Sequence, residues 1–279
     1  MIVESAPAKI NLALHVRRRR ADGYHDIETL FAFATAGDRV TVAPAARESF
    51  ALTGPFAAAL ADASSDPSDN LVTRAASAFA RAFASVGAWA ITLDKHLPIA
   101  SGIGGGSADA AATLRALARL HAIDVADPRL VAVAAALGAD VPACLLGRTA
   151  LGTGRGDALV PVAGLPGTAL LLVNPGVAVS TAAVFAGWDG IDRGAIAPGA
   201  LLDRARAGRN DLEPAARALA PAIDAVLAAL AAAPGVLLAR MSGSGATCFA
   251  LFADDAARDA AAATARAAGH WCLATTLAR

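Results

Sequence analysis

Lysine is almost absent from this chain of 279 residues. Of the 24 basic residues only Lys9 and Lys95 are lysine, so 24 − 2 = 22 are arginine. Such a bias usually follows the base composition of a genome. In a chain that uses arginine almost everywhere, however, each remaining lysine is a candidate for a task that needs a compact ammonium group. Both lysines lie close to the motifs described below, which strengthens this interpretation.

The chain also lacks net charge. Its 24 basic residues balance 24 acidic ones, for a formal charge of +0. A protein that binds nucleic acid usually carries a basic field, and one that binds a cationic partner an acidic field. We therefore expect no nucleic-acid partner. The oligomeric state is left open by the sequence.

Cysteine is scarce, and no targeting or membrane segment is evident. Cys144, Cys248 and Cys272 are far apart and show no CxxC spacing, as expected for reduced thiols in a cytosol. The opening residues MIVESAPAKIN have neither the basic nor the apolar region of a signal peptide. The longest apolar stretches, near 159–173 and 222–239, are interrupted by Pro, Gly or Asp. We expect a cytoplasmic protein with no membrane partner.

Histidine provides no metal site. His15, His96, His121 and His270 do not have the spacing of metal ligands, so we expect them to be structural.

Periodicity predicts a mixture of strands and helices. Alternating or continuous apolar runs predict strands at 10–16, 26–33, 39–43, 49–53, 88–94, 169–175, 236–241, 246–252 and 270–277. Helical spacing predicts helices at 70–86, 107–120, 128–137, 181–187, 198–206, 214–232 and 255–268. The first of these runs from Asn70 to Val86. The Gly- and Pro-rich stretch 146–167 is predicted to separate the two halves of the chain.

The stretch PIASGIGGGSADAAATLRAL, residues 98–117, combines a glycine-rich loop with the start of a helix. A helix that begins on open backbone amides can bind an anion, and phosphate is the obvious one. Glycines let the backbone approach phosphate oxygens without an intervening Cβ, and Ser107 adds a hydroxyl. A side chain at Gly105 is therefore expected to weaken phosphate binding while leaving the fold intact. The alternative is a loop that merely allows tight packing of the helix.

Three familiar glycine motifs do not fit this loop. A P-loop ends in Gly-Lys-Ser/Thr, but Gly106 is followed by Ser107 and Ala108. A dinucleotide fingerprint that starts at Gly102 has Ser107 in place of its third glycine. A protein kinase would need HRD and DFG segments, which the sequence lacks.

Three segments together resemble the GHMP kinase family of galactose, homoserine, mevalonate and phosphomevalonate kinases. They are PAKINLAL near the start, LPIASGIGGGSADAAATL in the middle and MSGSGATCFALF near the end, in the family's order and spacing. The shorter motifs DGYH, GADVP and NDLEP are most similar to the branch that phosphorylates a cytidine-diphosphate-linked methylerythritol. The resemblance covers essentially the whole chain.

The resemblance implies an α+β, two-domain GHMP kinase fold. Residues 1–155 would form an N-terminal ATP-binding domain like domain 2 of ribosomal protein S5. Residues 156–279 would form a C-terminal ferredoxin-like domain. The implied activity is transfer of phosphate from ATP, with Mg²⁺, to a hydroxyl of that small molecule.

The resemblance also implies roles for individual residues. Lys9 and Asp140 match the catalytic pair, with Asp140 accepting the proton of the attacking hydroxyl and Lys9 offsetting charge. The residues matched to substrate binding are Asn11, Tyr24, His25 and Phe185, of which the last three would hold the cytosine. The residues matched to ATP binding are Pro98, Ile99, Ala100, Ser101, Gly102, Ile103, Gly104, Gly105, Gly106, Ser107 and Ala108. Lys95 and Asn70 lie where the family has contacts near the nucleotide.

Each assignment has a plainer alternative. Asp140 could cap the turn before Pro142, and Phe185 could belong to the core. Tyr24 and His25 could be an exposed pair after a hairpin, and the run Arg17–Arg20 a solvated one. The loop also departs from many relatives, because Ala108 and Asp109 stand where Ser-Asn is common.

Two other functions remain open at this point. One is another GHMP kinase, such as a homoserine or sugar kinase, although such substrates offer no base for Tyr24, His25 and Phe185 to hold. The other is a catalytically silent relative that only binds a ligand. Retention of both Lys9 and Asp140 argues against it.

Overall fold

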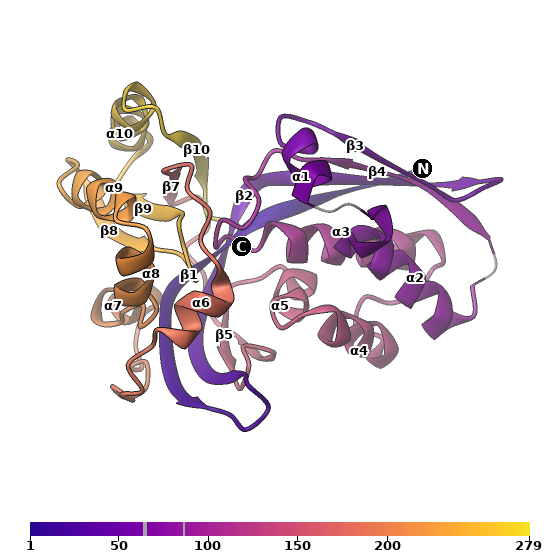
Figure 1. Ribbon diagram of the computed structural model, residues 1–279, viewed down its shortest axis with the longest axis horizontal. Coiled ribbons are helices and arrows are strands. Elements are labelled where there is room, and N and C mark those ends of the chain that lie inside the picture. Colours follow the sequence, from indigo (N-terminus) through magenta and orange to yellow (C-terminus); the bar gives the residue numbers. More distant parts are fainter. Residues whose placement is uncertain (64–65, 86) are drawn as a thin grey trace. The chain divides into compact units, whose positions relative to one another are not determined.

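The chain is divided into two compact units. The structure is a computed structural model that describes residues 1–63, 66–85 and 87–279 (Figure 1). Unit 1 comprises Met1–Ala8, Ala36–Ile99 and Gly104–Gly147, and unit 2 comprises Lys9–Thr35, Ala100–Ile103 and Arg148–Arg279. Strands β1 (Ile2–Arg19) and β2 (His25–Ala45) pair with each other and contribute residues to both units. A domain boundary near residue 155 stays a prediction.

Unit 1 combines a sheet with a group of helices. In the sheet, β4 (Ala88–Asp94) lies between β2 and β3 (Ser49–Thr53), antiparallel to the first and parallel to the second. The helices are α1 (Ala57–Ala63), a short 3₁₀ helix (Pro67–Asp69), α2 (Leu71–Phe83), α3 (Gly105–Leu120), α4 (Pro128–Leu137) and α5 (Val141–Leu146). Figure 1 shows α2 to α5 gathered together, and α3 packs against α2, α4 and α5.

Helix α2 illustrates how local sequence sets the limits of an element. Its buried residues include Val72, Ala75 and Phe79, which recur at helical spacing along one face. Asn70 caps the start, because its side chain accepts a hydrogen bond from the N–H of Val72. The helix ends at Phe83, since Ala84 adopts the left-handed region with φ +47°. The predicted end, Val86, lies outside the described residues.

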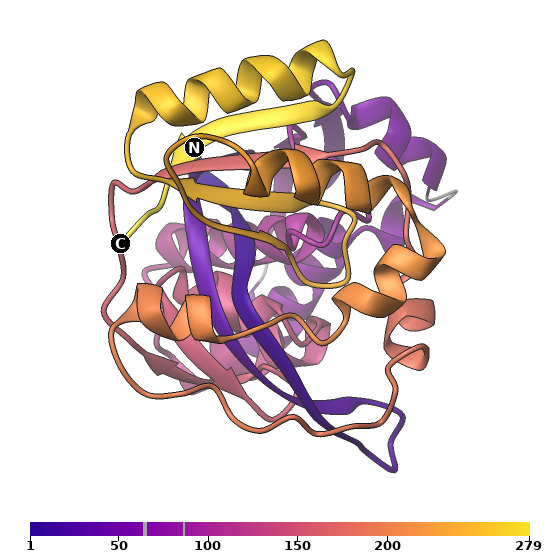
Figure 2. The same ribbon diagram turned by 90° about the vertical axis from the view of Figure 1, so that its left-hand side faces the viewer.

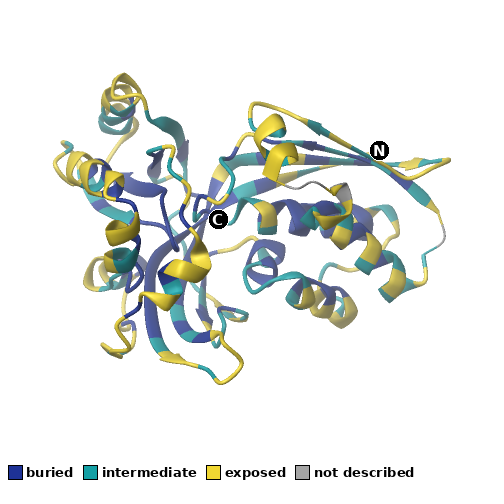
Figure 3. Cartoon of the chain, in the orientation of Figure 1, coloured by how far each residue is buried: buried dark blue, intermediate teal, exposed yellow. Residues whose placement is uncertain are grey.

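Helix α3 is the central helix of unit 1. Ten of its residues are buried, among them Leu114 and Leu117, and Figure 3 shows the burial along its length. Most of the other buried residues are alanines, whose small side chains let neighbouring helices approach closely. The helix that begins at the glycine-rich loop is therefore held rigidly by its surroundings.

Unit 2 contains an antiparallel sheet in the order β10-β7-β9-β8, from β7 (Ala169–Asn174), β8 (Val236–Met241), β9 (Cys248–Phe252) and β10 (Trp271–Thr276). Helices α9 (Ala222–Ala231) and α10 (Asp255–Ala267) pack on this sheet (Figure 2). The other helices are α6 (Thr181–Ala186), α7 (Leu201–Ala207) and α8 (Glu213–Leu219). The predicted α+β architecture is confirmed.

The Gly- and Pro-rich stretch 146–167 is not only a separator. It contains β5 (Ala150–Thr153) and β6 (Ala158–Pro161), which pair as an antiparallel hairpin. Strand β5 also pairs with residues 29–31 of β2. Gly152 is needed here for packing, because a Cβ on it would lie 2.7 Å from Cε2 of Phe31.

The long helix predicted at 214–232 is wrong. The structure has two helices, α8 and α9, separated at Ala220 and Pro221. Proline disfavours helical geometry in the residue before it, and Ala220 accordingly leaves the helical region with φ −138° and ψ 80°. Among the described residues, no helix is both long enough and apolar enough to cross a membrane.

Candidate functional site

Lys9 lies in the buried part of β1, and hydrogen bonds hold its side chain. The residue is 3% exposed. Its Nζ donates to Oδ1 of Asn11 at 2.9 Å, and Nδ2 of Asn11 donates to Oγ1 of Thr29 at 2.8 Å. Nζ also lies 5.5 Å from the ring centroid of Phe31, a cation–π distance. Lys9 and Asn11 are two residues apart on β1 and share a strand face, and their hydrogen bond orients the ammonium.

The middle of the glycine-rich loop is anchored by the motif MSGSGA. The Oγ of Ser242 donates to the carbonyl of Gly102 at 3.0 Å and accepts from the N–H of Asn11 at 3.2 Å. Gly102 has φ +77°, and a Cβ on it would lie 2.5 Å from the carbonyl oxygen of Ser242. This glycine is therefore required by both backbone conformation and packing. Ser242 was not among the predicted site residues, although it belongs to the motif MSGSGA.

Two backbone hydrogen bonds complete this anchorage. The N–H of Lys9 donates to the carbonyl of Ile103 at 2.9 Å, and the N–H of Thr247 donates to the carbonyl of Ser101 at 3.1 Å. Segments far apart in the sequence thus fix residues 100–103 within unit 2.

The start of α3 has the geometry of an anion site. Gly104 is the N-cap residue with φ +65°, and no side chain caps the helix. The N–H groups of the first helical turn have no partner within a helix. The first intrahelical bond reaches Gly104 from the N–H of Ala108 at 2.8 Å. Gly106 is exposed and Ser107 is half-buried, so this turn is accessible to a ligand such as phosphate.

Asp140 occupies the N-cap position of α5 but does not cap it. Its side chain forms no capping hydrogen bond with the helix. Its carbonyl oxygen accepts from the N–H of Cys144 at 3.0 Å, and the residue is half-buried. The plainer alternative, in which the side chain of Asp140 caps this helix, is therefore wrong.

His25 and Phe185 lie together in unit 2. Their ring centroids are 5.0 Å apart, and the planes are tilted by 33°. The ring of Trp188 stands edge-on to His25 with a centroid distance of 5.7 Å. Trp188 is 9% exposed, and its buried Nε1 has no hydrogen-bond partner in the described part of the chain. The sequence offered no signal for Trp188, because a lone Trp near a short helix normally indicates core packing.

Tyr24 differs from this pair in its exposure. It is 52% exposed, and the guanidinium of Arg155 lies 5.1 Å from its ring centroid. A ring in this setting can stack on a ligand without first being uncovered.

The electrostatics around His25 favour its neutral form. Burial lowers the pKa of His25, and the charge of Arg19 lowers it further. The Nε of Arg19 donates to Nε2 of His25 at 3.4 Å. This contact assigns the ring proton to Nδ1, because Nε2 acts as the acceptor.

The other arginines of the run Arg17–Arg20 form ion pairs. Arg18 pairs with Asp26 at 2.5 Å, and Arg20 pairs with the same carboxylate at 2.9 Å. Arg17 lies 3.2 Å from Asp192. Their described contacts are with acidic side chains, as the plainer reading of this run expects.

Lys95 and Asn70 have structural partners. The ammonium of Lys95 is 2% exposed and lies between the carboxylates of Asp38 and Asp109 at 2.5 and 2.6 Å. Asn70 caps α2 as described above. Both side chains therefore have partners within unit 1, and their contacts with a nucleotide stay a prediction.

The motif NDLEP joins β1 to the turn after β8. Nδ2 of Asn210 donates to the carbonyls of Met241 and Gly243 at 2.9 and 2.8 Å. Oδ2 of Asp211 accepts from the N–H of Val16 at 2.8 Å. The motif therefore supports the elements that carry Lys9 and Ser242.

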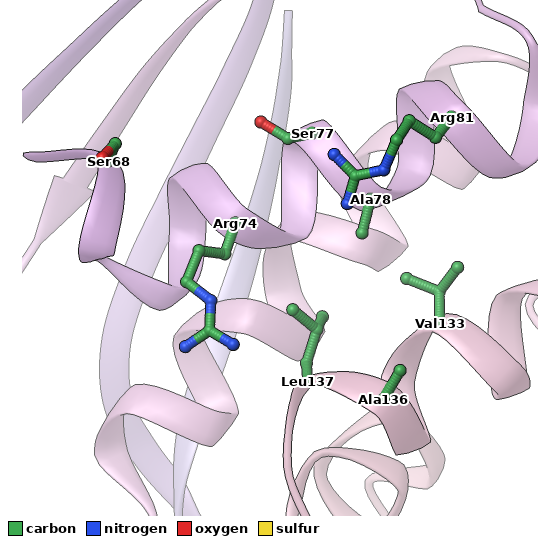
Figure 4. Close-up of a pocket in the computed structure, with 8 residues that line it drawn as sticks. All are labelled: Ser68, Arg74, Ser77, Ala78, Arg81, Val133, Ala136 and Leu137. Carbon is green, nitrogen blue, oxygen red and sulfur yellow. The ribbon is translucent and has the colours of Figure 1, made fainter.

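A hollow of about 310 Å³ lies between α2 and α4 (Figure 4). Its lining residues are Ser68, Arg74, Ser77, Ala78, Arg81, Val133, Ala136 and Leu137. None of them is a predicted site residue, so the ATP and substrate predictions do not depend on this hollow.

Comparison with family profiles identifies two matching regions. Residues 70–148 match the profile described as GHMP kinases N terminal domain, and residues 194–270 match GHMP kinases C terminal.

Comparison with curated proteins and solved structures extends the likeness to nearly the whole chain. The chain is 60% identical to a 4-diphosphocytidyl-2-C-methyl-D-erythritol kinase of Rhizorhabdus wittichii, over 92% of this chain and 88% of that protein. It is 50% identical to the kinase of that name from Novosphingobium aromaticivorans, over 98% and 92%. A crystal structure of 4-(cytidine 5'-diphospho)-2C-methyl-D-erythritol kinase matches with TM-score 0.81 and 36% identity, over 100% of both chains.

Proposed function

Because the chain belongs to the GHMP kinase family, we propose that it transfers the γ-phosphoryl group of ATP to the 2-hydroxyl of 4-diphosphocytidyl-2-C-methyl-D-erythritol. The products would be ADP and the phosphorylated substrate, an intermediate of non-mevalonate isoprenoid biosynthesis. The observation that carries this proposal is the likeness to kinases of that name over almost the entire chain.

The aromatic group in unit 2 supports the substrate assignment. The rings of Phe185 and His25 are adjacent, and with Nε2 of His25 accepting from Arg19, its Nδ1–H is the ring donor. A cytosine has a flat face to stack and an edge that both donates and accepts hydrogen bonds. A homoserine or sugar substrate has no base to stack on these rings.

Lys9 and Asp140 are proposed to perform the chemistry. The carboxylate of Asp140 would take the proton of the substrate hydroxyl as its oxygen bonds to the γ-phosphorus. The bond between the γ-phosphorus and the bridging oxygen of ADP would break at the same time, and ADP would leave with that electron pair. Lys9, held by Asn11, would offset negative charge on the reacting groups.

The start of α3 suits the phosphates of ATP. Its open amides and the accessible Gly106 and Ser107 are what a polyphosphate requires. Among the described residues, no group of three or more His, Cys, Asp or Glu side chains is arranged around a metal position. Mg²⁺ is proposed to accompany the nucleotide, where it would neutralise charge on the phosphate oxygens.

A reducing, cytoplasmic location is proposed with this function. All three cysteines are free, and burial raises the pKa of the Cys248 and Cys272 thiols. Such thiols are poor nucleophiles and suit a compartment that keeps cysteine reduced.

The substrate assignment is tested by comparing acceptors. Release of ADP is measured with the cytidylated compound, with methylerythritol phosphate, which lacks the base, and with homoserine. Stacking contributes about 1–3 kcal/mol per base, so Phe185→Ala should raise KM for the cytidylated compound by roughly 5- to 150-fold. KM for ATP should change little.

Val160→Ala serves as the matched control, because it also shortens an apolar side chain in unit 2 and Val160 is 60% exposed. Equal phosphorylation of the base-free acceptor by the wild-type protein would overturn the cytidine assignment. Phosphorylation of homoserine in preference to both other acceptors would favour a different kinase of the family.

A further inference from the structure

Unit 1 contains a cluster of three buried charges that the proposed chemistry does not use. Nζ of Lys95 donates to Oδ2 of Asp38 at 2.5 Å and to Oδ2 of Asp109 at 2.6 Å. The side chains are 2%, 0% and 3% exposed. Burial alone would lower the pKa of Lys95, but the carboxylates of Asp109 and Asp38 outweigh it and raise the pKa. The ammonium therefore keeps its charge.

The two carboxylates have unequal hydrogen bonding. Oδ1 of Asp38 accepts from the backbone N–H groups of His96 and Leu97 at 2.5 and 2.8 Å. Oδ1 of Asp109 is buried and has no hydrogen-bond partner among the described residues. A buried carboxylate oxygen without a donor is costly, because it has lost water and gained nothing in return. Of the two carboxylates, that of Asp109 is therefore less stabilised by hydrogen bonds in its ionised form.

The cluster lies directly beneath the start of α3. A Cβ on Gly105 would lie 3.0 Å from Nζ of Lys95 and 3.8 Å from Oδ2 of Asp38. Asp109 is one turn further along the same helix. The charges are therefore next to the open amides that suit a phosphate group.

The sign of the net charge is unexpected at such a place. One ammonium and two carboxylates sum to +1 − 2 = −1 if all three are ionised. A negative charge beside a phosphate site opposes binding, and little solvent is present to screen it. One carboxylate would be enough to neutralise the ammonium, so the second leaves the cluster with excess negative charge.

We propose that Asp109 is a positioning residue of the phosphate loop, which takes up a proton when the loop binds a polyphosphate. The inference rests on the proposed function, in which this loop binds ATP. The proton comes from solvent and is placed on the carboxyl group of Asp109, most simply on the open Oδ1. The cluster then passes from a net charge of −1 to zero, while Asp38 still holds Lys95 beneath Gly105.

The protonation properties of Asp109 agree with this role. Burial raises its pKa to about 7, with Lys95 opposing the rise and Asp38 adding to it. A bound polyphosphate adds further negative charge and raises the pKa again. Protonation of Asp109 is therefore within reach of a ligand at neutral pH.

Several other charged groups lie on α3 or on the helices packed against it. On α3 itself, Arg115 and Arg119 pair with Glu4. The charged groups on helices packed against α3 are Arg74 and Arg81 of α2, Arg129 of α4, which pairs with Asp127, and Asp140 at the start of α5. The charges that shift the pKa of Asp109 are those of Lys95 and Asp38.

The experiment measures proton uptake when ADP binds in the presence of Mg²⁺. Calorimetric titrations at about pH 8 are run in two buffers with different ionisation enthalpies. Wild type should take up a fraction of a proton, and its Kd should rise up to about tenfold per pH unit as pH increases above about 7. Asp109→Asn, which keeps the shape but cannot be ionised, should lose the uptake and flatten this dependence.

Asp203→Asn is the matched control, because Asp203 is exposed on α7, and it should behave as wild type. Difference infrared spectroscopy of the wild type adds a readout that needs no variant: ADP should increase the band of a protonated carboxyl group. Equal proton uptake by wild type and Asp109→Asn, or no gain in that band, overturns the role of Asp109. Failure of the wild type to bind ADP overturns the proposed function itself.

Discussion

At the residue scale, the position of Lys9 explains why a compact ammonium is needed. The side chain is enclosed, with Asn11 on one side and the ring of Phe31 on another. A guanidinium is larger and planar, and would not fit the same enclosure without displacing these neighbours. This is a physical reason for a lysine in a chain that uses arginine almost everywhere else.

Removing either proposed catalytic group should reduce turnover much more than nucleotide affinity. Lys9→Met keeps the volume but removes the charge, and Asp140→Asn keeps the shape but removes the base. Each should lower kcat by at least about 100-fold, because electrostatic and general-base contributions act in the transition state. Steady-state kinetics and ADP titration check this.

Asp203→Asn again controls for loss of a carboxylate. Turnover within a factor of a few of wild type for Lys9→Met or Asp140→Asn would contradict the assignment of that residue.

The contact between Arg19 and His25 predicts a pH effect. The pKa of His25 is lowered in the folded protein, so the folded state binds this proton less tightly than the unfolded chain. Stability linked to His25 is therefore present above about pH 6.5 and is lost as pH falls through the lowered pKa. Arg19→Ala should raise the pKa of His25 without restoring its ordinary value, since burial is the larger cause.

Nuclear magnetic resonance titration of the His25 ring measures this directly. Arg18→Ala is the control, because Arg18 pairs with Asp26 instead. An unchanged or lowered pKa of His25 in Arg19→Ala would mean that the guanidinium does not act on the ring.

At the element scale, two adjacent glycines at the start of α3 look equivalent in the sequence but have different surroundings. A Cβ on Gly105 would press on the clamped ammonium of Lys95 at 3.0 Å, whereas a Cβ on Gly106 would meet only Cδ1 of Leu71 at 3.3 Å. The expectation that a side chain at Gly105 leaves the fold intact therefore needs revision. Packing disfavours a side chain at Gly105, in addition to the access to phosphate proposed for this glycine.

We expect Gly105→Ala to lower the free energy of unfolding by about 1–3 kcal/mol, as overpacking does. Gly106→Ala should change it by about 0.5 kcal/mol or less, because the higher helix propensity of alanine offsets a mild contact. Both variants should weaken ADP binding. Urea denaturation and ADP titration of the pair test this, and equal stability of the two variants would contradict the packing argument.

The elements themselves were predicted well where local signals are strong and poorly where long-range packing dominates. The predicted strands at 10–16 and 26–33 are parts of the much longer β1 and β2. Residues 8–16 of β1 are all buried, polar ones such as Asn11 and His15 included, so burial in this strand does not follow the apolar–polar alternation of the sequence. Gly152 has the appearance of a turn residue in the sequence, yet it lies in strand β5. The position is glycine because the ring of Phe31 occupies the space that a side chain would need.

The candidate site shows the same division. The phosphate loop at the start of α3 was predicted from a motif with a local mechanism, and the roles of Lys9 and Asn11 from the family resemblance; all of these stay predictions. Trp188 and Ser242 did not, because what matters about them is a contact with a residue far away in the chain. Such contacts leave no pattern in a single sequence.

At the scale of the whole molecule, the resemblance of three short motifs was sufficient for the fold class. The α+β, two-domain GHMP kinase fold is confirmed by the family profiles and by the structural match. The make-up of the units was beyond sequence reasoning. Each unit is assembled from three separate stretches of chain, and composition along the sequence carries no record of which stretches fold together.

The two buried lysines can report the opening of the two units, one lysine for each unit. Lys9 belongs to unit 2 and Lys95 to unit 1, at 3% and 2% exposure, and the sequence has no other lysine. Amine-acylating reagents should therefore leave both side chains unmodified in the native protein. Each lysine should become reactive only when its own unit opens, so brief acylation in increasing urea, read by mass spectrometry, gives one opening free energy per unit. Acylation of either lysine at the rate of a free amine in native buffer would contradict this protection, whereas different urea midpoints for the two would mean that the units open independently.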